Sequence, residues 1–178
     1  FVGYGSGRYA TAANNTFYGM ASGGLTTTGT QNVASGTFAL YENTTGSYNV
    51  ASGYKALEDN TTGSNNTADG YQTLRFNTTG FRNTAIGHSA GYSITTGSNN
   101  LVLGYNAQSS SATVSNEITL GDNQITTFRC NVQTISSLSD GRDKTEVEDL
   151  PLGLDFIDTL RPVKFKWDTR DGNGKDGS

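Results

Sequence analysis

A glycine returns at one fixed spacing along most of this chain, and this spacing constrains the fold more than any other feature of the sequence. The series is Gly19, Gly36, Gly53, Gly70, Gly87, Gly104 and Gly121, and a second glycine series with the same period runs from Gly29 to Gly97. Two series that stay in phase over such a length define an internal repeat. The chain must therefore be built largely from stacked copies of one short unit.

Each repeat combines a strand pattern with a turn pattern. In Asn49–Gly53, an asparagine is followed by a β-branched residue, a small residue, one further residue and then the glycine, and this alternation predicts a strand of about five residues. In Asn43–Gly46, the letters Asn-Thr-Thr-Gly predict a turn in which the glycine supplies a positive φ and the asparagine caps the bend. This turn also matches the N-glycosylation acceptor pattern, which we interpret as turn chemistry, at Asn43, Asn60 and Asn77.

A unit as short as one of these repeats cannot bury a core by itself. Stacking solves this problem, because each strand can pair with the same strand of the next coil at a distance of ~4.8 Å. Only 33% of the residues are hydrophobic, which excludes a large globular core. We therefore predict an all-β fold, a parallel β-solenoid or β-roll of 17-residue coils, over residues 1–121, with an irregular first coil at residues 1–18.

Coils this thin and polar are expected to need partner chains that cover their remaining apolar surface. We predict a homotrimer on this ground. One column of the repeat contains only small side chains, which would allow neighbouring backbones to approach closely. We therefore expect that column to lie at the interface between chains: Ala34, Ala51, Ala68 and Ala85.

The charge and composition exclude several classes of function. The net charge is −4, so no nucleic-acid partner is expected, and no apolar run is long enough for membrane insertion. Calcium-binding β-roll repeats need an aspartate in each Gly-Gly-x-Gly-x-Asp unit. Here Asp69 is the one carboxylate at a strand position of the repeat, so no metal site or cofactor is predicted. Cys130 is the single cysteine; no intrachain disulfide can form, and we expect a buried free thiol.

An aromatic column follows the first glycine of several repeats. It contains Tyr54, Tyr71 and Tyr105, and His88, the single histidine, shares it. We expect these side chains to form a ladder on the surface, and a catalytic role for His88 is disfavoured. The tyrosines are candidates for contact with a glycan, although plain packing is the commoner role of such a ladder.

The composition changes at Ser139. Residues 1–138 carry 11 charged side chains, whereas the shorter stretch 139–178 carries 17. We predict closing strands or a linker at 122–138, including Ile125–Phe128, and a separate unit at 139–178. Helical spacing at Leu152–Leu160 and alternation at Val163–Trp167 indicate the beginning of a small α+β domain.

The repeat pattern over residues 15–121 resembles the head repeats of trimeric autotransporter adhesins and related bacteriophage fibre repeats. The resemblance rests on Asn-[Thr/Val]-Ala-x-Gly-Tyr followed by Asn-Thr-Thr-Gly-Ser. It implies left-handed parallel β-rolls in a threefold bundle, although the usual period of those repeats is shorter than the period found here.

The segments Ser139–Lys144 and Gly153–Trp167 resemble the start of the self-cleaving intramolecular chaperone domain of phage tail fibres and endosialidase tailspikes. That family helps three chains to fold together and is then cut off near its first residue. The resemblance implies Ser139 as a nucleophile and Lys144 as its general base, although Asp143 stands where the family usually has an apolar residue. Without the resemblance, the simpler interpretation is that Ser139 caps a turn and that Lys144 is a solvated cation.

The sequence thus favours a segment of a homotrimeric virion tail fibre or tailspike that attaches to a host glycan or protein receptor. The alternative hypotheses are an extracellular stalk of a bacterial surface adhesin and a non-catalytic part of a glycan-degrading tailspike enzyme. The repeat region itself is predicted to be non-enzymatic, because no two carboxylates pair in a cleft-like pattern.

Overall fold

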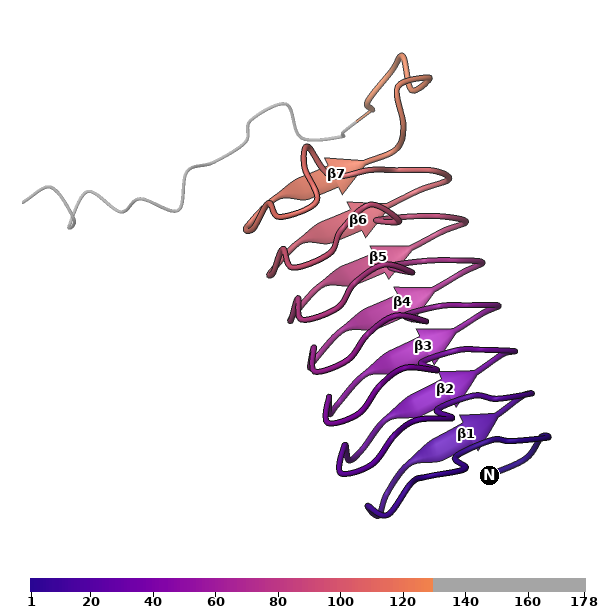
Figure 1. Ribbon diagram of the computed structural model, residues 1–178. Coiled ribbons are helices and arrows are strands. Elements are labelled where there is room, and N and C mark those ends of the chain that lie inside the picture. Colours follow the sequence, from indigo (N-terminus) through magenta and orange to yellow (C-terminus); the bar gives the residue numbers. More distant parts are fainter. Residues whose placement is uncertain (130–178) are drawn as a thin grey trace, which may run out of the picture. The chain divides into compact units, whose positions relative to one another are not determined.

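The computed structural model describes residues 1–129, which form a parallel β-solenoid (Figure 1). One short strand per coil contributes to a single sheet of seven strands whose spatial order follows the chain. The strands are β1 Thr16–Tyr18, β2 Val33–Ser35, β3 Val50–Ser52, β4 Thr67–Asp69, β5 Thr84–Ile86, β6 Leu101–Leu103 and β7 Ile118–Leu120. The predicted all-β solenoid is confirmed.

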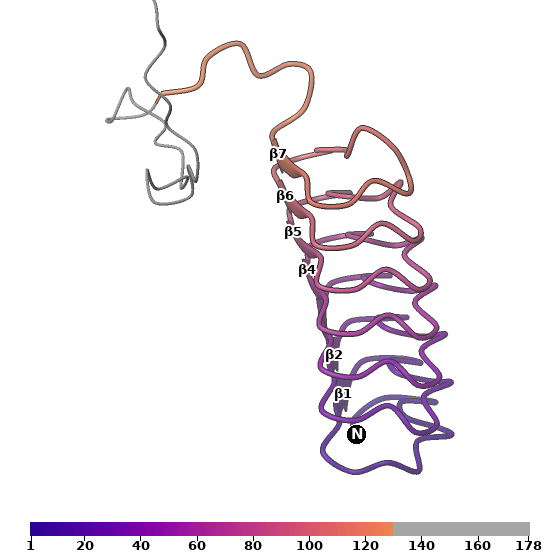
Figure 2. The same cartoon turned by 90° about the vertical axis from the view of Figure 1, so that its left-hand side faces the viewer.

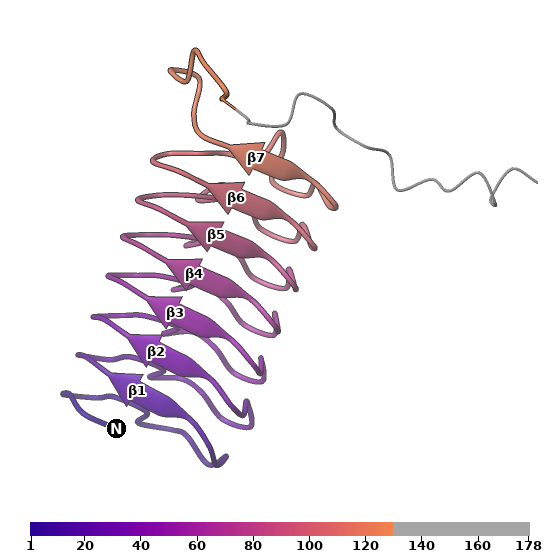
Figure 3. The ribbon, with the colours of Figure 1, turned by 180° about the vertical axis from the view of Figure 1, so that it is seen from behind.

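Every strand pairs in parallel with the equivalent strand of the next coil, in a register set by the repeat. Val50 of β3, for example, pairs with Thr67 of β4, its equivalent in the following repeat. The view in Figure 2 shows the strands along one side of the stack and irregular loops completing each coil on the other. Figure 3 shows the same sheet from behind. The strands have three residues rather than the five expected, because a glycine with a φ near 130°, such as Gly53, follows directly.

The middle residue of each of the strands β1 to β6 is buried inside the solenoid. Ala51 and Ala68 are completely buried within the single chain, beside the leucines Leu57 and Leu74 of the returning loops. A residue that is already inaccessible in one chain cannot form a contact between chains. The prediction that the alanine column lies at a trimer interface is therefore wrong: these alanines are small because the coil is narrow.

Glycine is required in the two series for different physical reasons. Gly53 has a φ of 130°, and a Cβ there would collide with the carbonyl oxygen of Gly70 in the next coil. Gly46, in the Asn-Thr-Thr-Gly turn, is not among the residues with positive φ, which corrects the prediction for this turn. Its Cβ would collide with the carbonyl oxygen of Gly63 and the side-chain oxygen of Asn43, so close approach requires the glycine.

Positive φ values also occur at residues that are not glycine. Leu57 and Lys55 have φ values of 52° and 57° within a single coil. A third such position recurs in every coil, at Asn14, Gln31, Tyr48, Asn65, Arg82, Asn99 and Asn116. Several left-handed residues per coil allow the chain to turn sharply enough to close within one short repeat.

A ladder of buried asparagines precedes the strands and joins neighbouring coils. The side-chain oxygen of Asn66 accepts a hydrogen bond from the backbone N–H of Asn83 at 2.9 Å. Its side-chain nitrogen donates to the carbonyl oxygen of Gly80 at 2.8 Å. The same pair of bonds recurs along the ladder, so these buried amides are satisfied, and each one fixes the position of the next coil.

A second ladder lies at the turn. Asn60 donates to the carbonyl oxygen of Gly63 and to the side-chain oxygen of Asn43, and Asn77 repeats this arrangement with Gly80 and Asn60. The predicted capping role of these asparagines is confirmed. All three side chains are completely buried, which agrees with their interpretation as turn residues rather than glycan acceptors.

The two ends of the stack differ from its middle. Val2 forms a bridge with Tyr18, so the irregular first coil joins the same stack. Residues 122–129 form no strand, and the strand expected at Ile125–Phe128 is absent. The Ile125 and Phe128 side chains are exposed and have no neighbouring strand to pair with in the described part of the chain.

Candidate functional site

The predicted aromatic ladder forms on the surface of the solenoid. The ring centroids of Tyr54 and Tyr71 lie 5.2 Å apart, those of Tyr71 and His88 4.8 Å, and those of His88 and Tyr105 5.1 Å. Neighbouring rings are tilted by only 14° to 25°. The spacing follows from the coil repeat, because side chains at equivalent positions are separated by about one strand spacing of 4.8 Å. The surface position predicted for His88 is confirmed.

This stacking limits what the ladder can bind. A sugar ring cannot enter between rings whose centroids are about 5 Å apart, because each face of Tyr71 already contacts a neighbouring ring. Ring edges and hydroxyl groups remain exposed, and Tyr105, at 67% exposure, is the most accessible of the three tyrosines. Lys55 lies over the other end of the ladder, 5.6 Å from the Tyr54 ring centroid. Glycan contact by Tyr54, Tyr71 and Tyr105 stays a prediction; the two end rings, Tyr54 and Tyr105, each stack on one ladder ring only, and Lys55 lies over Tyr54.

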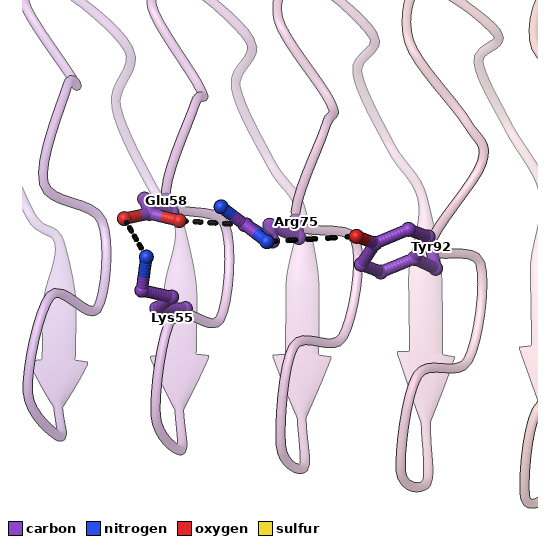
Figure 4. Close-up of polar contacts among 4 residues, drawn as sticks. All are labelled: Lys55, Glu58, Arg75 and Tyr92. Atoms are coloured by element: carbon purple, nitrogen blue, oxygen red, sulfur yellow. Dashed lines mark hydrogen bonds and ion pairs between the residues drawn. The ribbon is translucent and has the colours of Figure 1, made fainter.

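A polar cluster lies on the coils that carry the start of this ladder (Figure 4). Glu58 accepts from Lys55 at 2.9 Å through one carboxylate oxygen and from Arg75 at 2.7 Å through the other. Arg75 also reaches the hydroxyl group of Tyr92 at 3.5 Å. Glu58, Arg75 and Tyr92 occupy equivalent positions in successive repeats, so the repeat spacing is the sequence signal that predicts their contact, although no motif marks them.

The charged groups of this cluster pair with one another and link neighbouring coils. Burial lowers the pKa of Arg75, but its hydrogen bond to Glu58 and the charge of that carboxylate outweigh burial and raise the pKa above its usual value. Burial, followed by the charge of Glu58, raises the pKa of Asp59. Glu58 is shared between two cations and has no free oxygen for acid–base chemistry. The cluster therefore links coils and leaves no reactive group available.

Two further observations apply to the part of the chain that the structure describes. Within residues 1–129, no three His, Cys, Asp or Glu side chains gather into a group that could hold a metal ion. The same residues include no helix with the length and apolar character needed to cross a membrane.

The predicted cleavage residues Ser139 and Lys144, and also Cys130, lie outside the described residues. Their predicted roles therefore stay predictions. The described residues form the aromatic ladder and the polar cluster, and they do not include the predicted nucleophile and its base.

Comparisons with known proteins give one match. No curated protein and no solved structure matches this chain. The match that is found supports the resemblance of the C-terminal segment to an intramolecular chaperone. Residues 139–177 match the family described as the chaperone of endosialidase, Peptidase_S74.

Proposed function

We propose that this chain is a segment of a homotrimeric virion tail fibre or tailspike used in attachment to a host. In this proposal the solenoid forms the rod, and residues 139–178 begin an intramolecular chaperone that promotes assembly and is then cut off. The single observation that carries the proposal is the position of the chaperone match, which begins at Ser139, soon after the last repeat glycine, Gly121.

An outward-facing surface of the sheet supports assembly with further copies. The first and third residues of each strand point away from the core, and in β5 to β7 they are almost all apolar. Ile118 is 70% exposed, and Ile86 and Leu120 are also exposed. We name this surface the outer apolar patch; it consists of Ile86, Leu101, Leu103, Ile118 and Leu120. Adjacent exposed apolar side chains are typical of a protein interface, and this patch replaces the alanine column as the proposed contact between chains.

A substitution at Ile86 tests the assembly. Asp69 occupies the equivalent position one coil earlier, so an aspartate is compatible with the coil at this position. Ile86→Asp should leave the solenoid folded but convert a trimer to monomers in sedimentation velocity, because three carboxylates would have to be buried together. Ser35→Asp, at the same strand position outside the patch, is the matched control. A trimer that survives Ile86→Asp would exclude the outer apolar patch as the interface.

The cleavage proposal assigns a single turnover to Ser139 and Lys144. Lys144 accepts the hydroxyl proton of Ser139 while the oxygen attacks a backbone carbonyl, as a serine hydroxyl needs a base to become nucleophilic. Attack on the Leu138 carbonyl transfers the acyl group to the Ser139 oxygen and frees the Ser139 amine, and water then hydrolyses the ester. Cleavage between Ser139 and Asp140 is the alternative, and the mass of the product distinguishes the two.

Expression of the full-length gene tests this chemistry. Ser139→Ala and Lys144→Ala should each abolish the shortened product, as measured by intact mass, whereas Lys166→Ala in the same segment should not. If either variant at Ser139 or Lys144 is processed at the wild-type rate, the assignment of that residue is incorrect.

A further inference from the structure

A hollow of about 280 Å³ lies across the first three coils, away from the stacked part of the aromatic ladder. Tyr4, Arg8 and Tyr9 of the first coil line it on one side, and Phe38 and Tyr41 of the third coil line it on the other. Its volume is below the roughly 300–1,000 Å³ of sites that enclose a drug-sized ligand. The size therefore suits a single ring.

The hollow exists because two columns are interrupted in the second coil. Ala21 stands where the following coils carry Phe38, Lys55 and Gln72. Gly24 stands where the following coils carry Tyr41, Glu58 and Arg75. Without large side chains at these two positions, the second coil lines the bottom of the hollow, and the Tyr41 ring lies against Gly24, where an added Cβ would come within 2.8 Å of it.

The spacing of the walls matches one inserted ring. The first and third coils are separated by two strand spacings, or about 9.6 Å. A ring midway between them would lie about 4.8 Å from the level of each coil, close to the 4.8 Å and 5.2 Å between neighbouring ring centroids in the ladder. Phe38 and Tyr41 support each other in an edge-to-face pair with centroids 5.4 Å apart, which fixes one wall.

Arg8 gives the hollow a charge preference. It is the single charged residue in the lining, and its guanidinium lies 5.3 Å from the Tyr9 ring centroid. Gly7 and Gly23 have equivalent φ values of 56° and 57°, so Arg8 aligns with Gly24, in the column of Glu58 and Arg75. Within residues 1–129 both ion pairs involve Glu58, which leaves Arg8 without a carboxylate partner.

We propose that this hollow binds a single pyranose ring that carries a carboxylate, as in a hexuronic acid. Aromatic walls favour the apolar faces of a sugar ring, and an unpaired guanidinium favours a carboxylate, to which it can donate two parallel hydrogen bonds. This inference goes beyond the proposed fibre function, since binding at the first three coils depends neither on cleavage at Ser139 nor on assembly through Ile86.

The test uses saturation-transfer NMR titration of the full chain with methyl glucuronide and, separately, with methyl glucoside. We expect the glucuronide to bind more tightly, and Arg8→Gln to weaken its binding about three- to tenfold while leaving the glucoside unaffected. Ala21→Gln should abolish binding of both sugars by filling the hollow. Glutamine is compatible with the fold there, because Gln72 occupies the same column with a φ of 53°, close to the 56° of Ala21.

Arg82→Gln is the matched control, because Arg82 also lies over an aromatic ring, 5.7 Å from the Phe81 centroid, but far along the stack. Equal affinity for the two sugars, or an equal loss of binding in Arg82→Gln, would overturn the acidic ligand. Unchanged binding in Ala21→Gln would overturn the hollow as the site. The assembly variant Ile86→Asp should still bind the glucuronide, so failure of the fibre proposal and failure of this inference give different results.

Discussion

The inward-facing and outward-facing columns of this solenoid obey different rules. Inside, the same residue type recurs in coil after coil: the strand-preceding asparagines, the alanines and the glycines with φ near 130°. Outside, the column after the glycine changes from Met20 to Thr37 to Tyr54, and then to the stacked ladder. The repeated inward-facing residues therefore build the coil. Changes of residue type in the outward-facing columns create surface features, such as the hollow at Ala21 and Gly24.

The largest expected effect comes from breaking an inward column. Gly53→Ala places a Cβ against the carbonyl oxygen of Gly70 at a φ that disfavours side chains, and backbone cannot move aside cheaply. We expect a loss of about 2–6 kcal/mol in the free energy of unfolding, from about 1–3 kcal/mol each for strain and overpacking. Chemical denaturation measures this, with the neighbouring Ser52→Ala as the control. Equal stability of Gly53→Ala and wild type would contradict the steric explanation.

The next effect comes from the asparagine ladder. Asn66→Ala leaves the backbone N–H of Asn83 without its acceptor in the interior, whereas the carbonyl oxygen of Gly80 keeps the hydrogen bond from Asn77. The orphaned N–H costs about 1–3 kcal/mol, so we expect a clear fall in the denaturation midpoint. The exposed Thr62→Ala in the same coil should be nearly neutral. If both variants unfold at the same midpoint, the ladder does not stabilise the stack.

A smaller effect is expected on the outside. Tyr71→Ala removes the stacking with both Tyr54 and His88, and an aromatic pair contributes about 0.5–1.5 kcal/mol beyond its buried area. Tyr71→Phe keeps the ring and should be close to wild type in a thermal melt. A larger loss from Tyr71→Ala than from Asn66→Ala would reverse the proposed order of inward and outward contributions.

The smallest effect concerns pH. Because burial and Glu58 raise the pKa of Asp59, the folded protein binds a proton at this carboxyl more tightly than the unfolded chain does. The ionised carboxylate therefore disfavours folding, and this contribution to stability falls as pH rises from 3.8 through the raised pKa. Asp59→Asn should be slightly more stable than wild type at pH 7, and the difference should vanish below pH 3.8. A variant that is less stable at neutral pH would show that the carboxylate contributes favourably.

The period, the parallel register and the ladders follow from the amino-acid sequence alone. Residues one period apart must stack when each coil repeats, so the meeting of Tyr71 with His88 follows from spacing alone. The resemblance at Ser139–Lys144, supported by the family match, also came from sequence. The direction in which each column faces depends on the folded chain. It placed Ala68 inside the coil rather than between chains, and it assigned positive φ to Gly53 and Leu57 rather than to Gly46.

The physical reason is that a period defines neighbours along the stack but not the path of the chain around one coil. That path depends on the backbone dihedrals of every residue in the coil together, including left-handed residues that are not glycine. The hollow illustrates the same limit. Ala21 and Gly24 can be read from the sequence, but the folded path of the coil decides that they line one hollow together with Arg8.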